Sequence, residues 1–172
     1  MPAKTSTFRR FMTALKRHWQ SALPGVRPVA EKVGYLSRGL TFDAGEIAQF
    51  EQQVYLEFQN GRYEPGHFTI NVIVADKGRE PTASMVRDKP GEKRANGGRR
   101  IGDFVGDQRT DKWWHLCEIS IDDTRANLRR GHWSATSYAN EDEVIAAAVA
   151  DVTQDVEVAL KALGASSVSA AS

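Results

Sequence analysis

Apolar residues near the start of the chain recur at the spacing of a helix. From Ser6 onward they are three and four positions apart, which places them on one helical face: Phe8, Phe11, Met12, Leu15, Trp19 and Ala22. Thr5 or Ser6 can serve as the N-cap, and Pro24-Gly25 ends the helix. The pattern predicts an amphipathic helix up to Pro24, followed by a second short turn or helix at residues 27–33.

A longer helical pattern lies near the end of the chain. Asn140 precedes it, and Glu143 stands at the position of a capping-box partner. The apolar stripe that follows keeps helical spacing: Val144, Ile145, Ala148, Val152, Val156, Ala159 and Leu163. Gly164 is the expected end of this helix, and residues 165–172 are expected to be a disordered tail.

Between these helices, four segments alternate between apolar and polar positions, as strands do. They cover residues 35–42, 53–59, 67–75 and 112–121. The linker at residues 60–66 is rich in turn formers and short enough to make the middle two segments an antiparallel hairpin. In the last segment, alternation places Trp113 and His115 on one face and Trp114 on the other.

Together these elements predict one α+β domain over residues 1–164. A small antiparallel sheet of about four to five strands is expected to pack against the N- and C-terminal helices. The segment near residues 77–110 has few large apolar side chains, two prolines and a run of glycines and basic residues. That composition predicts a long flexible basic loop.

Composition narrows the class of protein. Cys117 is the only cysteine, which excludes an internal disulfide bridge and argues against a cysteine-based zinc site, and we expect a reducing compartment, the cytoplasm. Basic residues interrupt the apolar N-terminal positions, and nowhere do about eighteen apolar residues run together, which argues against a signal peptide or a membrane span. We expect no metal and no cofactor, because the histidines are scattered and the glycines form no phosphate-binding loop.

Charge is nearly balanced but unevenly placed. The formal net charge is +1, yet residues 1–30 contain six Lys or Arg and no acid, whereas residues 141–157 contain six acids and no base. We expect the two helices that carry these charges to lie side by side or to expose solvated faces.

Five short motifs follow one another along the chain. They are Gly34-Tyr35, Thr41-Phe42, Phe68-Thr69-Ile70-Asn71-Val72, Arg100-Ile101-Gly102 and Asp111-Lys112-Trp113-Trp114. In this order they resemble the bacterial family called domain of unknown function 4304, over roughly residues 8–116. The chain departs from the family pattern in a longer basic loop before Arg100 and in an additional segment at residues 122–138. The resemblance implies membership of that family but supplies no reaction and no catalytic residue.

One face of the predicted sheet mixes aromatic and polar side chains, as ligand sites and protein-binding surfaces do. This face is expected to carry Tyr55, Glu57, Asn71 and Trp114, and we expect Arg100 and His115 to converge with them. The candidates are Tyr55, Glu57, Asn71, Arg100, Trp113, Trp114 and His115.

Three functions from different classes fit these residues, and whether the protein is an enzyme stays open. The favoured hypothesis is a non-enzymatic, immunity-like or adaptor domain that binds a protein partner or a second copy of itself, because tryptophan and arginine dominate interfaces. The first alternative is nucleic-acid binding through residues 87–100, which carry six basic residues against two acids. The second is a small hydrolase or transferase that uses His115 with Glu57 or Asp111 as acid and base.

Overall fold

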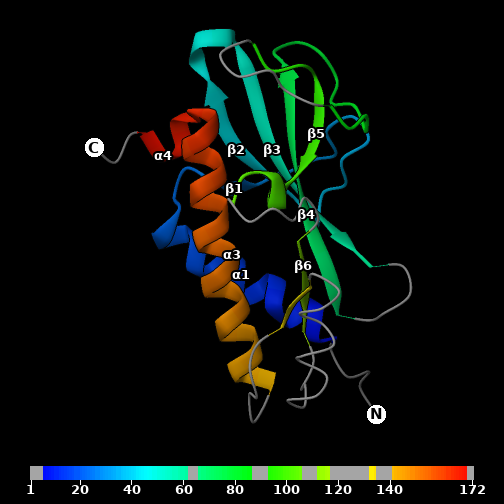
Figure 1. Ribbon diagram of the computed structural model, residues 1–172, viewed down its shortest axis with the longest axis vertical. Helices are drawn as coiled ribbons and strands as arrows, with labels where there is room; N and C mark the ends of the chain where they lie inside the picture. The colour runs from blue at the N-terminus through cyan, green and yellow to red at the C-terminus, as the bar shows by residue number, and fades with distance from the viewer. Residues whose placement is uncertain are drawn as a thin grey trace.

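The computed structural model describes residues 6–61, 66–86, 93–105, 112–116, 132–134 and 141–169. An antiparallel sheet with an N-terminal and a C-terminal helix confirms the α+β class (Figure 1). The helices are α1 (Thr7–Ala22), α3 (Glu141–Leu163) and α4 (Ser166–Ser169). The strands are β1 (Arg27–Pro28), β2 (Thr41–Ile47), β3 (Gln52–Asn60), β4 (His67–Asp76), β5 (Gly97–Arg100), β6 (Trp113–His115) and β7 (His132–Ser134), with 3-10 turns η1 (Ala48–Phe50) and η2 (Ile101–Asp103).

The sheet is built around β4. Strand order is β1-β2-β3-β4-β6-β7, with β5 paired to β4 beside this path, and all pairs are antiparallel except β6 with β7. Residues 71–74 of β4 pair with β5, whereas His67 and Phe68 pair with β6. The long edge of β4 therefore brings two segments together that are separate along the chain.

One face of the sheet is covered by α1 and α3, and the core lies between them (Figure 1). The apolar stripe of α1 buries Phe11, Leu15 and Trp19 against the inward side chains of β2, β3 and β4, as its spacing predicted. Their rings pack closely: the Trp19 and Phe42 ring centroids are 4.8 Å apart, in an edge-to-face arrangement.

The basic N-terminal segment and the acidic segment near the end of the chain contact each other through α1 and α3. The guanidinium of Arg10 donates to the carboxylates of Glu141 and Asp142 at the start of α3. In the core, Trp19 Nε1 donates to Thr153 Oγ1 at 2.9 Å. Among the described residues, no helix is both long enough and apolar enough to pass through a membrane.

Residues 29–40 do not form the strand or the helical turn expected around them. Only Thr41 and Phe42 of the predicted 35–42 strand belong to β2, and Arg27–Pro28 is the short edge strand β1. Residues 29–40, named here the crossing segment, reach across the sheet to Pro81, which lies beside Gly34. Gly34 has a φ of +56°, which breaks the extended path that alternation suggested.

The segment expected to be a flexible loop at 77–110 contains paired structure. Its residues 97–100 form β5, and η2 follows directly. Gly97 has a φ of +141°, and a Cβ there would lie 2.4 Å from the Ser84 carbonyl oxygen, so only glycine fits. Residues 87–92 and 106–110 of that prediction lie outside the described part.

The tail expected to be disordered from residue 165 instead begins with α4. The Ser166 hydroxyl accepts from the Glu46 amide at 3.0 Å, and the Ser167 hydroxyl donates to the Ala44 carbonyl at 2.6 Å. These serines satisfy backbone groups on the open edge of β2. Residues 170–172 lie outside the described part of the chain, as do residues 117–121 of the predicted fourth strand.

Candidate binding site on the outer sheet face

The face of the sheet turned away from α1 and α3, named here the outer face, carries a row of polar residues. Cross-strand pairing joins Thr41 to Glu57, Glu57 to Asn71, and Asn71 to Arg100, so the row runs over four adjacent strands. The alternation of β3 requires this placement, because its intervening residues Val54, Leu56 and Phe58 are in the core.

Arg100 is fixed in place by two amide side chains. Its Nη1 donates to Gln59 Oε1 at 2.7 Å and to Asn71 Oδ1 at 2.6 Å. Asn71 Nδ2 donates in turn to Gln59 Oε1 at 3.0 Å. The three side chains hold each other's orientation, which reduces the entropy that a binding partner must remove.

Aromatic rings continue the site from Arg100 towards β6. The guanidinium carbon lies 5.5 Å from the ring centroid of Trp113, within cation-π range. The Trp113 ring is 4.8 Å from that of His67, which is 4.9 Å from that of His115. All these residues are partly exposed except Asn71, which is buried. The outer-face patch is defined as Gln59, His67, Asn71, Arg100, Trp113 and His115.

Glu57 lies in the same row but beneath the crossing segment. Burial raises the pKa of Glu57, and the hydrogen bonds from Asn71 and Tyr35, together with the charge of Arg100, offset part of that rise. Burial and the Glu57 carboxylate together raise the pKa of Tyr35 to about 12. Glu57 Oε2 is buried and has no hydrogen-bond partner in the described part of the chain.

Trp114 does not belong to the site, contrary to expectation. It is opposite Phe68, fully buried on the core face, and its Nε1 donates to Asp151 Oδ2 of α3 at 2.7 Å. The neighbouring Lys112 ammonium bonds to Asp155 and lies 3.1 Å from Asp151 Oδ2. The prediction placed Trp114 on the same face as Asn71. The β4 and β6 pairing reverses this, because one residue of register exchanges the two faces of a strand.

Tyr55 is on the outer face but apart from the patch. It pairs with Asp43 and Ile73, one row beyond Glu57 along β3, and lines a cleft on the β1 side of the sheet. The structure thus groups Asn71, Arg100, Trp113 and His115, with Glu57 beneath Tyr35.

Two further patch residues and one covering residue were not among the candidates. Gln59 shares the alternation of Tyr55 and Glu57, so the pattern already placed it on this face. His67 is the first residue of β4, and its neighbours are known only once the pairing of β4 with β6 is known. The role of Tyr35 depends on the path of the crossing segment, which no local pattern indicated.

The geometry does not form the acid and base pair considered for an enzyme. His115 pairs with His67, and Glu57 pairs with Asn71, four positions further along β4. At about 3.3 Å per residue these sites are roughly 13 Å apart along the strand. Asp111 and Cys117 lie outside the described residues. Over the described ranges, no three His, Cys, Asp or Glu side chains gather as a metal site would require.

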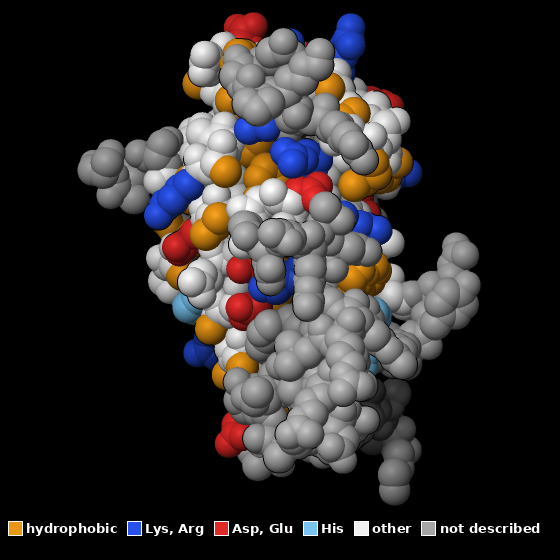
Figure 2. Space-filling model, in the orientation of Figure 1, with side chains coloured by type: hydrophobic (Ala, Val, Ile, Leu, Met, Phe, Trp, Pro, Cys, Tyr) orange, Lys and Arg blue, Asp and Glu red, His pale blue; other side chains and the backbone are white. Residues whose placement is uncertain are grey.

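The described cations of the basic loop are engaged within the fold. Lys93 lies 2.9 Å from Asp76, and Arg99 lies 3.5 Å from Asp103 with its guanidinium 4.7 Å from the Phe104 ring centroid. On the side of the molecule shown in Figure 2, basic and acidic side chains are interspersed. These contacts favour a structural role for residues 93–100 over binding of nucleic-acid phosphates.

Comparison of the chain with protein-family models, with curated proteins and with solved structures found no match. The resemblance to the 4304 family stays a prediction.

Proposed function

We propose that this protein is a non-enzymatic binding domain that holds a protein partner on the outer-face patch. The single observation that carries the proposal is the position of Arg100, held against the Trp113 ring by Gln59 and Asn71. A pre-arranged arginine beside a partly exposed tryptophan is typical of the residues that contribute most to protein interfaces.

The charge of the patch supports a partner of defined chemistry. Arg100 is its one permanently charged side chain. The nearest acid of the row, Glu57, is covered by Tyr35. The complementary partner surface carries a carboxylate next to an aromatic or aliphatic side chain, which packs on Trp113.

Three further parts of the proposal rest on the sequence alone. They are the adaptor or immunity-like class, the cytoplasmic location supported by the single Cys117, and membership of the 4304 family. A second copy of the chain is the simplest form that the partner can take.

The experiment compares Trp113→Ala and Arg100→Gln with wild type. Arg17→Gln, an exposed change on α1, is the matched control. Light scattering first measures whether the protein self-associates. Tagged baits then recover partners, which are identified, purified and titrated against each variant by calorimetry.

We expect the patch variants to weaken binding of the partner by about tenfold or more, and Arg17→Gln to leave it unchanged. If wild type is a dimer that Trp113→Ala dissociates, the partner is a second copy. A partner bound equally by wild type and both patch variants, or no partner and no self-association, contradicts the proposal.

A further inference from the structure

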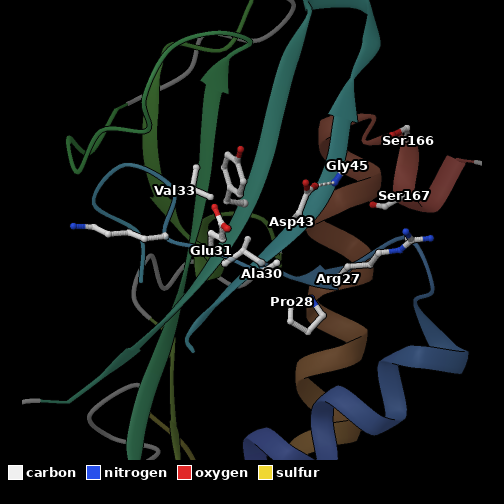
Figure 3. Close-up of a pocket in the computed structure, with 13 residues that line it drawn as sticks. Arg27, Pro28, Ala30, Glu31, Val33, Asp43, Gly45, Ser166 and Ser167 are labelled. Atoms are coloured by element: carbon white, nitrogen blue, oxygen red, sulfur yellow. Dashed lines mark hydrogen bonds between the residues drawn. The ribbon is translucent and has the colours of Figure 1, made fainter. Parts of the chain in front are cut away.

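A second concave feature lies on the β1 side of the outer face. This β1 cleft has a volume of about 800 Å³, and its floor is made by Asp43 and Tyr55, which pair across β2 and β3. One wall is β1 with residues 29–33, and the other is formed by Ser166 and Ser167 of α4 (Figure 3).

The floor of the β1 cleft is held by a bulge in β2. The register of β2 against β3 shifts between Asp43 and Glu46, where Gly45 has a φ of +88°. Asp43 Oδ1 accepts from the Gly45 amide at 2.9 Å and also from the Gln53 side chain. These two donors fix the orientation of the Asp43 carboxylate.

The wall formed by α4 is also held in place by specific contacts. Its two serines bond to the backbone of Glu46 and Ala44 on either side of the bulge. A Cβ added to Gly45 would lie 2.8 Å from Ser166 Oγ, so the approach depends on glycine. The hollow between β1 and α4 is therefore set by specific contacts with the bulge.

Two carboxylates face this hollow. Figure 3 shows the Glu31 carboxylate directed to the middle of the cleft, between Val33 and Asp43, whereas Arg27 extends away from it. Both bonds to Asp43 end on Oδ1, and no described residue donates to its Oδ2. Glu31 has no ion-pair or hydrogen-bond partner among the described side chains. The lining also includes the cations Arg27 and Lys32, and Glu31 and Asp43 are the two acids that an occupant of the hollow would meet.

The rest of the lining is aromatic and aliphatic. The partly buried Tyr55 contributes an aromatic side chain, and burial, together with the nearby charge of Asp43, raises the pKa of its phenol. Pro28, Ala30 and Val33 supply apolar surface. Carboxylates beside an aromatic side chain and an apolar wall are the groups that hold an organic cation with a carbon stem.

We propose that the β1 cleft binds an alkylguanidinium or alkylammonium group. Asp43 and Glu31 face its charge, Tyr55 provides a neighbouring ring, and Pro28 and Val33 contact its stem. The volume falls within the range of pockets for small organic ligands and exceeds what one side chain fills. The occupant is either a free amine or an arginine or lysine of a peptide. This site is separate from the outer-face patch and does not rest on the function proposed for it.

Three probes test whether binding depends on the charge of the ligand or only on its shape, and whether the occupant is a free amine or part of a peptide. Calorimetry is performed with agmatine, with N-acetyl-arginine amide and with N-acetyl-citrulline amide, which has nearly the same shape as the arginine probe but no charge. The full-length variants are Asp43→Asn and Glu31→Gln. The amide introduced by Asp43→Asn keeps an oxygen that can accept from the Gly45 amide, so the fold is preserved. The matched control is Glu51→Gln, an exposed change at the turn between β2 and β3.

We expect saturable one-to-one binding of at least one guanidinium probe, and at least about tenfold weaker binding of the citrulline probe. Asp43→Asn and Glu31→Gln should each weaken binding about fivefold or more, whereas Glu51→Gln and Trp113→Ala leave it unchanged. Binding of agmatine points to a free amine, and binding of the capped arginine alone points to a peptide. Equal affinity for citrulline and arginine probes, equal affinity in wild type and both acid variants, or no saturable binding of either cation overturns the proposal.

Discussion

Phe68 and Trp114 stack in the core with their ring centroids 5.3 Å apart and their planes at 14°. They are also backbone neighbours, because β4 and β6 pair at these two positions. The stack fixes the register of β6, and Trp113 must therefore point to the outer face. The binding role proposed for Trp113 depends on this one core contact.

The two adjacent tryptophans are predicted to contribute very unequally to stability. Trp114→Ala removes a fully buried ring and leaves a cavity, which should cost about 3–5 kcal/mol. Trp113→Ala removes a partly exposed ring, and we expect a loss of about 1 kcal/mol or less. Urea unfolding of both variants measures the difference. Similar losses would mean that β6 has the opposite register.

The elements that were predictable are those whose own residues repeat a pattern. Phe11, Leu15 and Trp19 recur on one face of α1, and the long alternation of β3 and β4 marks both strands and the hairpin between them. Such patterns reflect burial of one face, and they need no knowledge of distant contacts.

The elements that were missed are defined by contacts between distant segments. Gly97 and Gly98 of β5 have no side chains to alternate, and β5 exists because its backbone pairs with β4. The faces of Trp113 and Trp114 depend on register against β4, which a three-residue strand cannot show alone. For the same reason, Trp114 was expected to converge with Arg100 and Asn71, whereas the structure places Trp113 beside Arg100 instead.

Stability should depend on pH through Glu57. Because burial raises its pKa, the folded protein retains a proton at a pH where the unfolded chain has lost it. The resulting stabilisation is full below the unfolded pKa of about 4.3 and is lost as pH rises through the raised folded pKa. Glu57→Gln stays neutral and should lose less stability over this window than wild type, as measured by urea unfolding across pH.

Glu51→Gln, an exposed change, serves as the control for removing a glutamate elsewhere in the chain. A second readout is the phenol of Tyr35. Glu57→Gln should lower its pKa from about 12 while leaving it above the ordinary value, since burial is the larger cause. Ultraviolet titration against a Tyr35→Phe reference measures this shift. An unchanged value would contradict the contact between Tyr35 and Glu57.

Lys112 is predicted to join β6 to α3 through charge. Its ammonium contacts Asp155 and Asp151, and burial raises the pKa of Asp155 despite this contact. Lys112→Met should cost about 1–3 kcal/mol at neutral pH, less than a fully buried pair because Lys112 retains some exposure. The loss should shrink at acidic pH, where Asp155 takes up a proton. Unfolding curves at two pH values measure both effects.

A double variant tests whether the loss of stability in Lys112→Met comes from the Asp155 carboxylate, which that change leaves without its cation. Lys112→Met with Asp155→Leu should be more stable than Lys112→Met alone, because it removes the uncompensated charge. Lys16→Met on α1 is the control for removing a lysine elsewhere. If the double variant loses the sum of the two single losses, the residues are not coupled.

The short helix α4 is predicted to protect the edge of β2. Ending the chain after Gly164 removes the serines that bond to Glu46 and Ala44, and leaves these backbone groups on an open strand edge. We expect a loss of about 1–3 kcal/mol in urea unfolding and greater self-association in light scattering. Ending the chain after Ser169 keeps both serines and is the matched control, because it shortens the same tail. If the two truncations behave alike, the α4 contact does not stabilise β2, and the wall of the β1 cleft has another support.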